Sequence, residues 1–215
     1  MADTGLSITK EFITIGKELA GLSDLVRPTY RSCAADLYLI CKKLLEANEN
    51  IVRWFNKFLY FDFTSPNASF EFKKAAADYD TMKRGHELRK LKFSCTDIEN
   101  IYQKNIGKKI GSWFSNKKKV LKAQSIFSNL SSSDGQMILF LEDTLIPLLD
   151  KFVLKMEVSV SKKNFNAAER TRLKFRKESK PLVDLISDFN DELTELVITF
   201  AKMSNTPITL INAEK

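Results

Sequence analysis

The sequence predicts an all-α protein, an elongated antiparallel bundle of six or seven helices, several of them long and kinked. Seven stretches repeat their apolar residues with the period of a helix, and none shows the convincing alternation of a strand. Only seven Gly and five Pro in 215 residues leave few helix breakers. Hydrophobic residues make up 44% of the chain, enough for a substantial core. We expect a single domain over residues 1–204 and a loosely ordered tail over 205–215.

The stretch 164–203 carries the longest helical pattern. Its apolar residues recur at spacings of three and four, which is the heptad repeat of a packed helix. The resulting seam consists of Leu182, Ile186, Phe189, Leu193, Leu196, Phe200 and Met203. Projected backwards, the same register passes through Arg172, so the seam turns polar toward its N-terminal half. Asn166 and Glu169 fit a capping box at the start, and Pro181 is expected to kink or split the helix.

Two more long helices are predicted in the N-terminal part of the chain. Apolar stripes with helical spacing run over 8–26 and over roughly 28–60. Asn48 interrupts the second stripe. A polar residue at such a position either fixes helix register or is an ordinary, satisfied asparagine. The loop that follows, 61–67, is unusually apolar for a connection between helices.

The middle of the chain predicts further helices. They start at Ser65-Pro66 and at the capping box Thr96–Glu99. Ser115-Asn116 either caps another helix or lies within one helix that bends around Trp113. The stretch 137–160 is the most apolar, so we expect a central, buried helix there with a kink at Pro147. Glu142, Asp143 and Asp150 within it argue against insertion into a membrane.

The formal net charge of +7 favours anionic partners such as nucleic acid, phospholipid headgroups or acidic proteins. Three cysteines without metal-ligand or CxxC spacing fit a reducing compartment. The N-terminal residues lack the pattern of a secretory signal, and there is no run of about 18 uncharged apolar residues. We therefore expect an intracellular protein, either cytoplasmic or peripheral to a membrane.

Motifs for catalysis and for cofactor binding are not apparent. His86 is the only histidine, so a multi-histidine metal site cannot form. The glycines of residues 107–111 are not followed by Gly-Lys-Ser/Thr, so this segment is not a phosphate-binding P-loop. We expect no catalytic residues, no metal and no cofactor. An enzyme without a recognisable motif ranks third among the hypotheses.

The first candidate site is the lysine segment (104–122), which has seven lysines, no acidic residue and two aromatic residues at its centre. Lysines neutralise phosphates, while Trp and Phe stack on bases or lie at a lipid headgroup boundary. The alternative is a solvated lysine face with the Trp side chain in the core. The candidate anion-binding residues are Lys104, Lys108, Lys109, Lys117, Lys118, Lys119 and Lys122, with Trp113 and Phe114 as aromatic contacts.

The second candidate site is the arginine segment (162–180), with eight basic residues and two acidic ones. Arginine suits bidentate contact with phosphate. The alternative is a charged helix end that pairs with acidic residues elsewhere in the chain. The candidate anion-binding residues are Arg170, Arg172, Lys174, Arg176 and Lys177.

The leading hypothesis is a non-enzymatic helical interaction or scaffold module. It would bind an anionic surface of phospholipid headgroups, or an acidic protein partner, through the lysine and arginine segments. The alternative is a nucleic-acid-binding helical protein that uses the same segments. The 182–203 seam offers a further partner, a second copy of the chain in a homo-oligomer.

Overall fold

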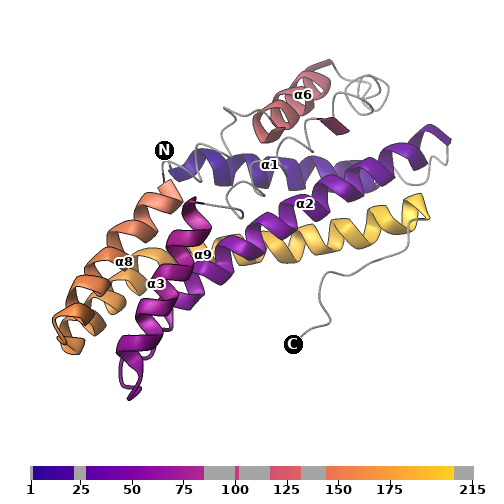
Figure 1. Ribbon diagram of the computed structural model, residues 1–215. Helices are drawn as coiled ribbons and strands as arrows, with labels where there is room; N and C mark the ends of the chain where they lie inside the picture. The colour runs from indigo at the N-terminus through magenta and orange to yellow at the C-terminus, as the bar shows by residue number, and fades with distance from the viewer. Residues whose placement is uncertain (1, 22–27, 85–99, 102–116, 132–143, 206–215) are drawn as a thin grey trace.

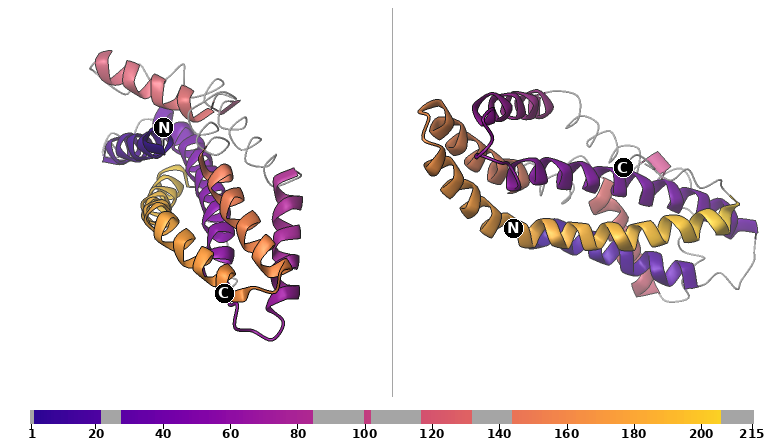
Figure 2. Two further views of the ribbon diagram at one scale, coloured as in Figure 1. Left: turned by 90° about the vertical axis from the view of Figure 1, so that its left-hand side faces the viewer. Right: turned by 90° about the horizontal axis from the view of Figure 1, so that it is seen from below.

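The computed structural model describes residues 2–21, 28–84, 100–101, 117–131 and 144–205 (Figure 1). Its helices are α1 (Ala2–Gly21), α2 (Pro28–Leu59), α3 (Ala68–Arg84), α6 (Lys117–Ser131), α8 (Ile146–Ser161) and α9 (Phe165–Ser204). No strand occurs in these residues, so the predicted all-α fold is confirmed. The described helices form an elongated molecule (Figure 2).

The two longest helices, α2 with 32 residues and α9 with 40, form an antiparallel pair along the molecule (Figure 1). Near the C-terminus of α2, the ring of Phe55 stacks on Phe175 from the N-terminal half of α9, with 5.7 Å between centroids. Near its N-terminus, Leu37 belongs to the same core as Phe200 from the C-terminal half of α9. Both helices therefore contribute to two separate cores.

The first bundle consists of α1, α6, the N-terminal half of α2 and the C-terminal half of α9. The largest fully buried side chains of its core are Phe12, Ile40, Leu44, Phe127 and Phe200. Helices α1 and α9 approach closely at Gly16, where an added Cβ would lie 2.8 Å from Cδ1 of Leu196. A larger residue at position 16 would therefore need Leu196 to move. Helix α6 packs on α1 on the outside of this bundle (Figure 1).

The second bundle consists of α3, α8, the C-terminal half of α2 and the N-terminal half of α9. Its core is rich in aromatic side chains, with Phe55, Phe58, Phe63, Phe72, Tyr79, Phe152 and Phe175 all buried. The apolar loop 61–67 is explained by this core, because Phe61 and Phe63 both contact the ring of Phe72, at 5.1 and 5.5 Å. Asn48, which interrupts the predicted stripe of α2, is buried and follows Ala47, the first residue of α2 in the second core.

Helix α9 follows the predicted seam through both bundles. The buried residues on it include Ala168, Phe175, Ser179, Val183, Ile186, Phe189, Leu193, Leu196 and Phe200. The helix starts earlier than predicted, because Asn164 is the N-cap and its Oδ1 accepts a hydrogen bond from the Ala167 amide at 3.0 Å. Pro181 lies inside the helix without splitting it. The ribbon changes direction between its two halves, as a helix without one backbone donor does (Figure 2).

Several predicted boundaries are corrected. Helix α1 already begins at Ala2, earlier than the predicted stripe over 8–26. Pro147 lies in the first turn of α8, where its missing N–H breaks no hydrogen bond of that helix. Helix α8 is not central, since Leu154 and Val158 on its outer face are 63% and 47% exposed. The central helices are α2 and α9.

Other predictions concern residues outside the described ranges. They include the capping box at residues 96–99, residues 137–143 of the apolar stretch and residues 206–215 of the tail. The single domain over 1–204 stays a prediction, as does a homo-oligomer through the 182–203 seam, whose buried side chains pack within the chain. In the part of the chain that the structure describes, no helix is both long and apolar enough to cross a bilayer.

Candidate anion-binding surfaces

The lysine segment is described only in its C-terminal part. Lys104, Lys108, Lys109, Trp113 and Phe114 lie outside the described residues. Lys117, Lys118, Lys119 and Lys122 lie on α6, which begins at Lys117. The structure therefore shows how four of the seven lysines are arranged, all of them on α6.

Helix α6 is attached to α1 by one apolar face and by two ion pairs at its edge. Ala123, Ile126, Phe127 and Leu130 are buried on that face. Beside it, Nζ of Lys119 lies 2.9 Å from the carboxylate of Glu18. Nζ of Lys122 lies 3.6 Å from the carboxylate of Glu11. These two ion pairs join α6 to α1, a contact that neither interpretation of the lysine segment predicted.

The opposite face of α6 is open. Lys117 and Lys118 are exposed, and Leu121 beside them is 55% exposed. Residues 117 and 121 are four apart, so they are neighbours on one side of the helix. The outer face thus combines ammonium groups with an exposed apolar side chain.

In the arginine segment, Arg172 has a structural role. Its guanidinium makes two hydrogen bonds to the carboxylate of Glu169, at 2.8 and 2.5 Å, and donates to the backbone carbonyl of Leu59 at 2.7 Å. Leu59 is the last residue of α2, where carbonyls lack helical donors and a positive charge is favourable. The hydrogen bonds to Glu169 raise the pKa of Arg172, and the hydrogen bond from Arg172 lowers the pKa of Glu169.

The rest of the arginine segment divides between internal contacts and solvent. Nζ of Lys174 lies 3.8 Å from Glu178, and the Arg176 guanidinium lies 5.1 Å from the centroid of the Tyr60 ring. Arg170 and Lys177 are exposed. Lys177 presents its charge to solvent, and Arg170 does so while its Nε donates a hydrogen bond to the Asn166 carbonyl at 3.3 Å.

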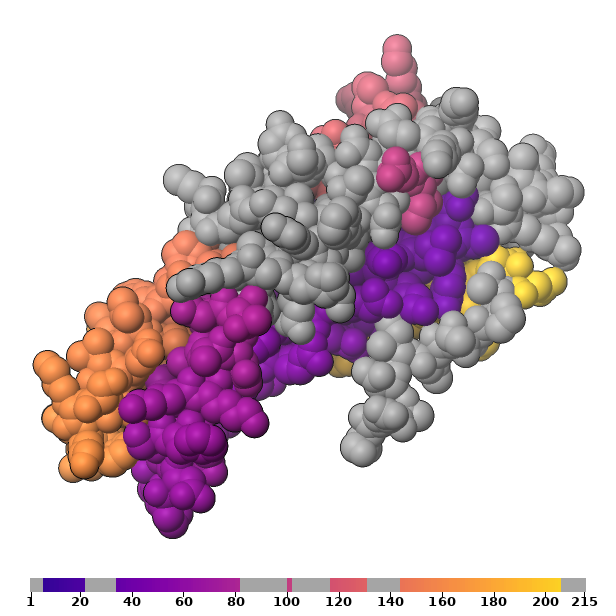
Figure 3. All heavy atoms as spheres, in the orientation of Figure 1, coloured from indigo at the N-terminus to yellow at the C-terminus, as the bar shows by residue number. Residues whose placement is uncertain are grey.

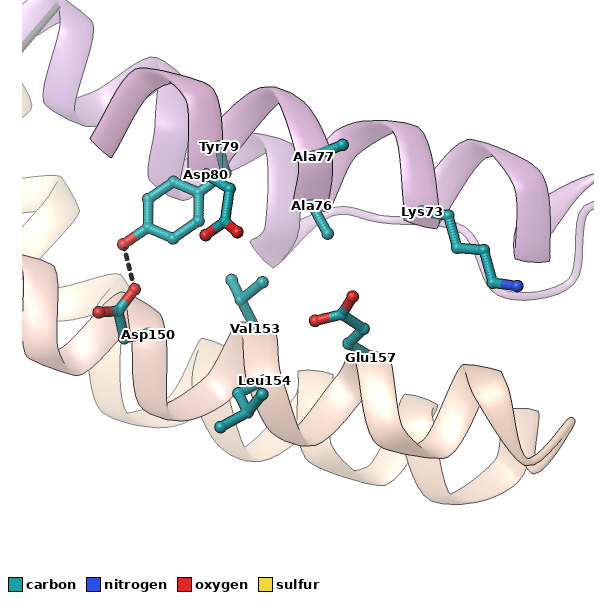
Figure 4. Close-up of a pocket in the computed structure, with 9 residues that line it drawn as sticks. All are labelled: Lys73, Ala76, Ala77, Tyr79, Asp80, Asp150, Val153, Leu154 and Glu157. Carbon is teal, nitrogen blue, oxygen red and sulfur yellow. Dashed lines mark hydrogen bonds between the residues drawn. The ribbon is translucent and has the colours of Figure 1, made fainter. Parts of the chain in front are cut away.

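A hollow of about 450 Å³ lies between α3 and α8 in the second bundle, and sequence analysis did not identify it (Figure 4). At one end, the hydroxyl of Tyr79 donates a hydrogen bond to Asp150 at 2.8 Å. Lys73 and Glu157 lie at the other end, and the small side chain of Ala76 lies between the ends. Figure 3 shows the surfaces of α3 and α8 side by side at this end of the molecule.

The chemistry of the hollow does not suggest catalysis. Burial raises the pKa of Tyr79, and the hydrogen bond to Asp150 raises it further. The hydroxyl therefore stays protonated near neutral pH and cannot act as a base. Among the described residues, no group of His, Cys, Asp and Glu side chains is arranged to hold a metal ion. The signal available in the sequence was Asp150, an acidic residue in the most apolar stretch of the chain.

The structure places the described part of the lysine segment and the arginine segment in different bundles. Helix α6 contributes to the core of the first bundle, whereas Phe175 in the arginine segment contributes to the core of the second. Comparison with protein-family models, with curated proteins and with solved structures finds no match to this chain.

Proposed function

We propose that the protein is a non-enzymatic helical interaction module that binds an anionic surface through the outer face of α6. The observation that supports this proposal is the division of lysines on that helix. Lys119 and Lys122 lie on the side of α6 that faces α1 and pair with it. The opposite side carries the exposed ammonium group of Lys117 next to the exposed Leu121, so it presents positive charge and apolar surface together.

The chemistry of the outer face favours phospholipid headgroups as the anionic surface. Leu121 is 55% exposed beside the outer lysines. An apolar side chain flanked by ammonium groups suits the boundary between headgroups and acyl chains. Each basic residue near an anionic bilayer contributes about 1 kcal/mol of attraction. Because α6 lies on the outside of the first bundle, this face can approach a flat surface without any change in the core (Figure 1).

The arginine segment has a smaller part in this proposal. Arg172 holds the end of α2 through the Leu59 carbonyl, and Lys174 pairs with Glu178. Replacing either residue would therefore affect internal contacts as well as charge. A test on exposed lysines of α6 avoids the loss of these internal contacts of α9.

The test compares two variants with the same change of net charge. In one, Lys117 and Lys118 on α6 are changed to Glu; in the other, the exposed pair Lys73 and Lys74 on α3 is changed to Glu. Sedimentation with liposomes of phosphatidylserine and phosphatidylcholine measures binding. We expect the α6 variant to lose at least about tenfold in affinity and the α3 variant to lose much less, since screening confines the effect to nearby charges.

A third variant separates a lipid surface from other anionic partners. Leu121→Ser should weaken binding to liposomes but leave binding to duplex DNA unchanged, because phosphate contact alone needs no apolar group. Equal losses for the α6 and α3 variants would contradict a specific surface on α6. Binding to DNA but not to liposomes would favour the nucleic-acid alternative. Wild-type protein that binds neither at low salt, but recovers an acidic protein lost in the α6 variant, would favour the protein partner.

A further inference from the structure

The outer face of α9 carries its charges in two opposed blocks. Arg170, Lys177, Asp184 and Asp191 are spaced by seven residues, so they form one row along the helix. A neighbouring row with the same spacing consists of Lys174, Pro181, Asp188 and Glu195. All eight side chains are exposed. Both rows are basic before the bend of α9 and acidic after it.

The charge layout of this face is not explained by contacts within the chain. Lys174 and Asp184 do have partners on α9, since Lys174 lies 3.8 Å from Glu178 and Lys180 lies 2.5 Å from Asp184. Within the described residues, however, Lys177 and Asp188 have no ion-pair partner. Basic residues toward the N-terminus and acidic ones toward the C-terminus are also the reverse of what the helix dipole favours. Stabilisation of α9 itself therefore does not account for the pattern.

We propose that this face is a dimer interface, on which α9 of a second copy of the chain lies antiparallel. A twofold axis beside Ser179 would place the basic block of each α9 opposite the acidic block of the other. Arg170 would then reach the level of the partner's Asp188. Because the twofold axis repeats every contact, each complementary ion pair occurs twice in the dimer and stabilises it twice. No other orientation of two identical helices brings both blocks together with opposite signs.

Two exposed leucines support this placement. Leu173 and Leu185 are 50% and 39% exposed, and they lie six residues before and after Ser179 on the borders of the charged rows. In the antiparallel pair they would come to the same level at opposite edges, where the aliphatic stems of lysine and arginine can cover them. Helix α9 lies along the outside of the molecule, so a second copy can approach this face (Figure 2).

The interface would be weak and sensitive to salt. The two rows are largely charged, and α9 is bent, so the contact is limited in area and in apolar content. Attraction between exposed charges falls as ionic strength rises. The dimer is therefore expected at low salt and at high protein concentration. The buried 182–203 seam has no part in it.

The test uses two variants with opposite charge on α9. In the acidic variant, Arg170 and Lys177 are changed to Glu; in the basic variant, Asp188 and Asp191 are changed to Lys. All four residues are exposed, and circular dichroism will confirm that both variants fold. Sedimentation velocity over a concentration series measures self-association. We expect the wild type to dimerise, each variant alone to dimerise at least about tenfold more weakly, and an equimolar mixture of the two to form a heterodimer.

Three outcomes would overturn the proposal. They are a wild type that stays monomeric at low salt over the whole series, variants that self-associate as the wild type does, and a mixture that stays monomeric. Leu173→Ser provides a second test without a change of charge and should also weaken the dimer. The α6 variant Lys117→Glu/Lys118→Glu should dimerise normally, which distinguishes this interface from the proposed anionic contact of α6.

Discussion

The two bundles share α2 and α9 but use polar side chains in different ways. In the first bundle, the helices are linked at the rim by exposed ion pairs. One of them joins Lys119 to Glu18, whose side chains are 54% and 43% exposed. In the second bundle, the side chain of Arg172 is only 13% exposed, and its guanidinium donates a hydrogen bond to the Leu59 carbonyl. Exposed ion pairs also link helices of the second bundle, as Lys57 with Asp78 does, so this bundle differs by adding a sheltered contact at the end of α2.

This difference agrees with the roles proposed for the two ends. A helix attached through an apolar face and exposed ion pairs, as α6 is, keeps its outer face available for a partner. In the second bundle, Arg172 satisfies the end of α2, and Tyr79 joins α3 to α8 through Asp150. Contacts of this kind fix helices relative to one another. The proposed anionic contact would therefore lie on the first bundle, while the core of the second holds its helices in place.

The largest expected effects come from the two cores. Phe175→Ala should lower the free energy of unfolding by about 3 to 5 kcal/mol, because the ring is fully buried against Phe55 and Phe152. Leu193→Ala should lower it by about 2 to 5 kcal/mol in the first bundle. Urea unfolding followed by far-UV circular dichroism measures both losses.

The same pair of variants tests whether the bundles unfold together. Trp54 packs against the core of the second bundle, and replacing Trp113 by Phe leaves Trp54 as the single tryptophan reporter. Because α2 and α9 run through both bundles, we expect Leu193→Ala to shift the Trp54 transition as well. A Trp54 transition that Leu193→Ala leaves in place would show that the bundles unfold independently.

The sequence predicted α9 well because its seam is local. Phe189, Leu193 and Phe200 recur with a fixed period, and burial of one face requires no knowledge of the partner helix. The polar position in the projected seam, Arg172, was also in register, but its acceptor is Leu59, 113 residues away. Periodicity shows that a side chain faces inward and does not show what it meets.

The candidate site was less predictable for the same reason. Nothing local distinguishes Lys119 from Lys118 in a run of three lysines. The distinction arises from Glu18, 101 residues away, and from the direction in which α6 lies on α1. The position of α8 was also predicted wrongly, because an apolar helix with Leu154 exposed has the composition of a central one. Contacts between residues far apart in the sequence determine which lysine forms an ion pair and which helix is central.

The next largest effect compares one polar contact from each bundle. Arg172→Ala removes hydrogen bonds to Glu169 and to the Leu59 carbonyl in a sheltered site, and should cost about 1 to 3 kcal/mol of stability. Lys119→Ala removes an exposed ion pair with Glu18 and should cost at most about 0.5 kcal/mol. Urea unfolding at low and high salt measures both. Equal losses, or a loss for Arg172→Ala that disappears in high salt, would remove the distinction between the bundles.

A smaller effect is expected at the hollow between α3 and α8. Tyr79→Phe deletes the hydroxyl that donates to Asp150 at 2.8 Å but keeps the buried ring. We expect a loss of about 0.5 to 1.5 kcal/mol, since the aromatic contacts with Phe58 and Trp54 remain. Tyr60→Phe is the control, because Tyr60 is 53% exposed and should change stability little. Comparable losses in the two variants would mean that the bond to Asp150 adds nothing to the second bundle.

The smallest effects should appear as opposite pH dependences of the two bundles. In the second bundle, the hydrogen bond from Arg172 lowers the pKa of Glu169 below its ordinary value of 4.5. Its contribution to stability is therefore present above pH 4.5 and is lost as the pH falls through the lower, folded-state pKa. In the first bundle, the hydrogen bond to Glu192 raises the pKa of Lys17 above 10.5. This contribution is present below pH 10.5 and is lost as the pH rises through the higher, folded-state pKa.

Glu169→Gln and Lys17→Gln separate these two dependences. Glu169→Gln should flatten the acid side of the curve of unfolding free energy against pH and leave the alkaline side unchanged. Lys17→Gln should do the reverse. Both groups are partly or largely exposed, so each effect is small and is best measured as the difference from wild type in parallel urea titrations. Raising the salt concentration should remove the effect of Lys17→Gln but spare that of Glu169→Gln. This result would show that salt screens the exposed pair of Lys17 and Glu192 more strongly than the pair of Glu169 and the sheltered Arg172.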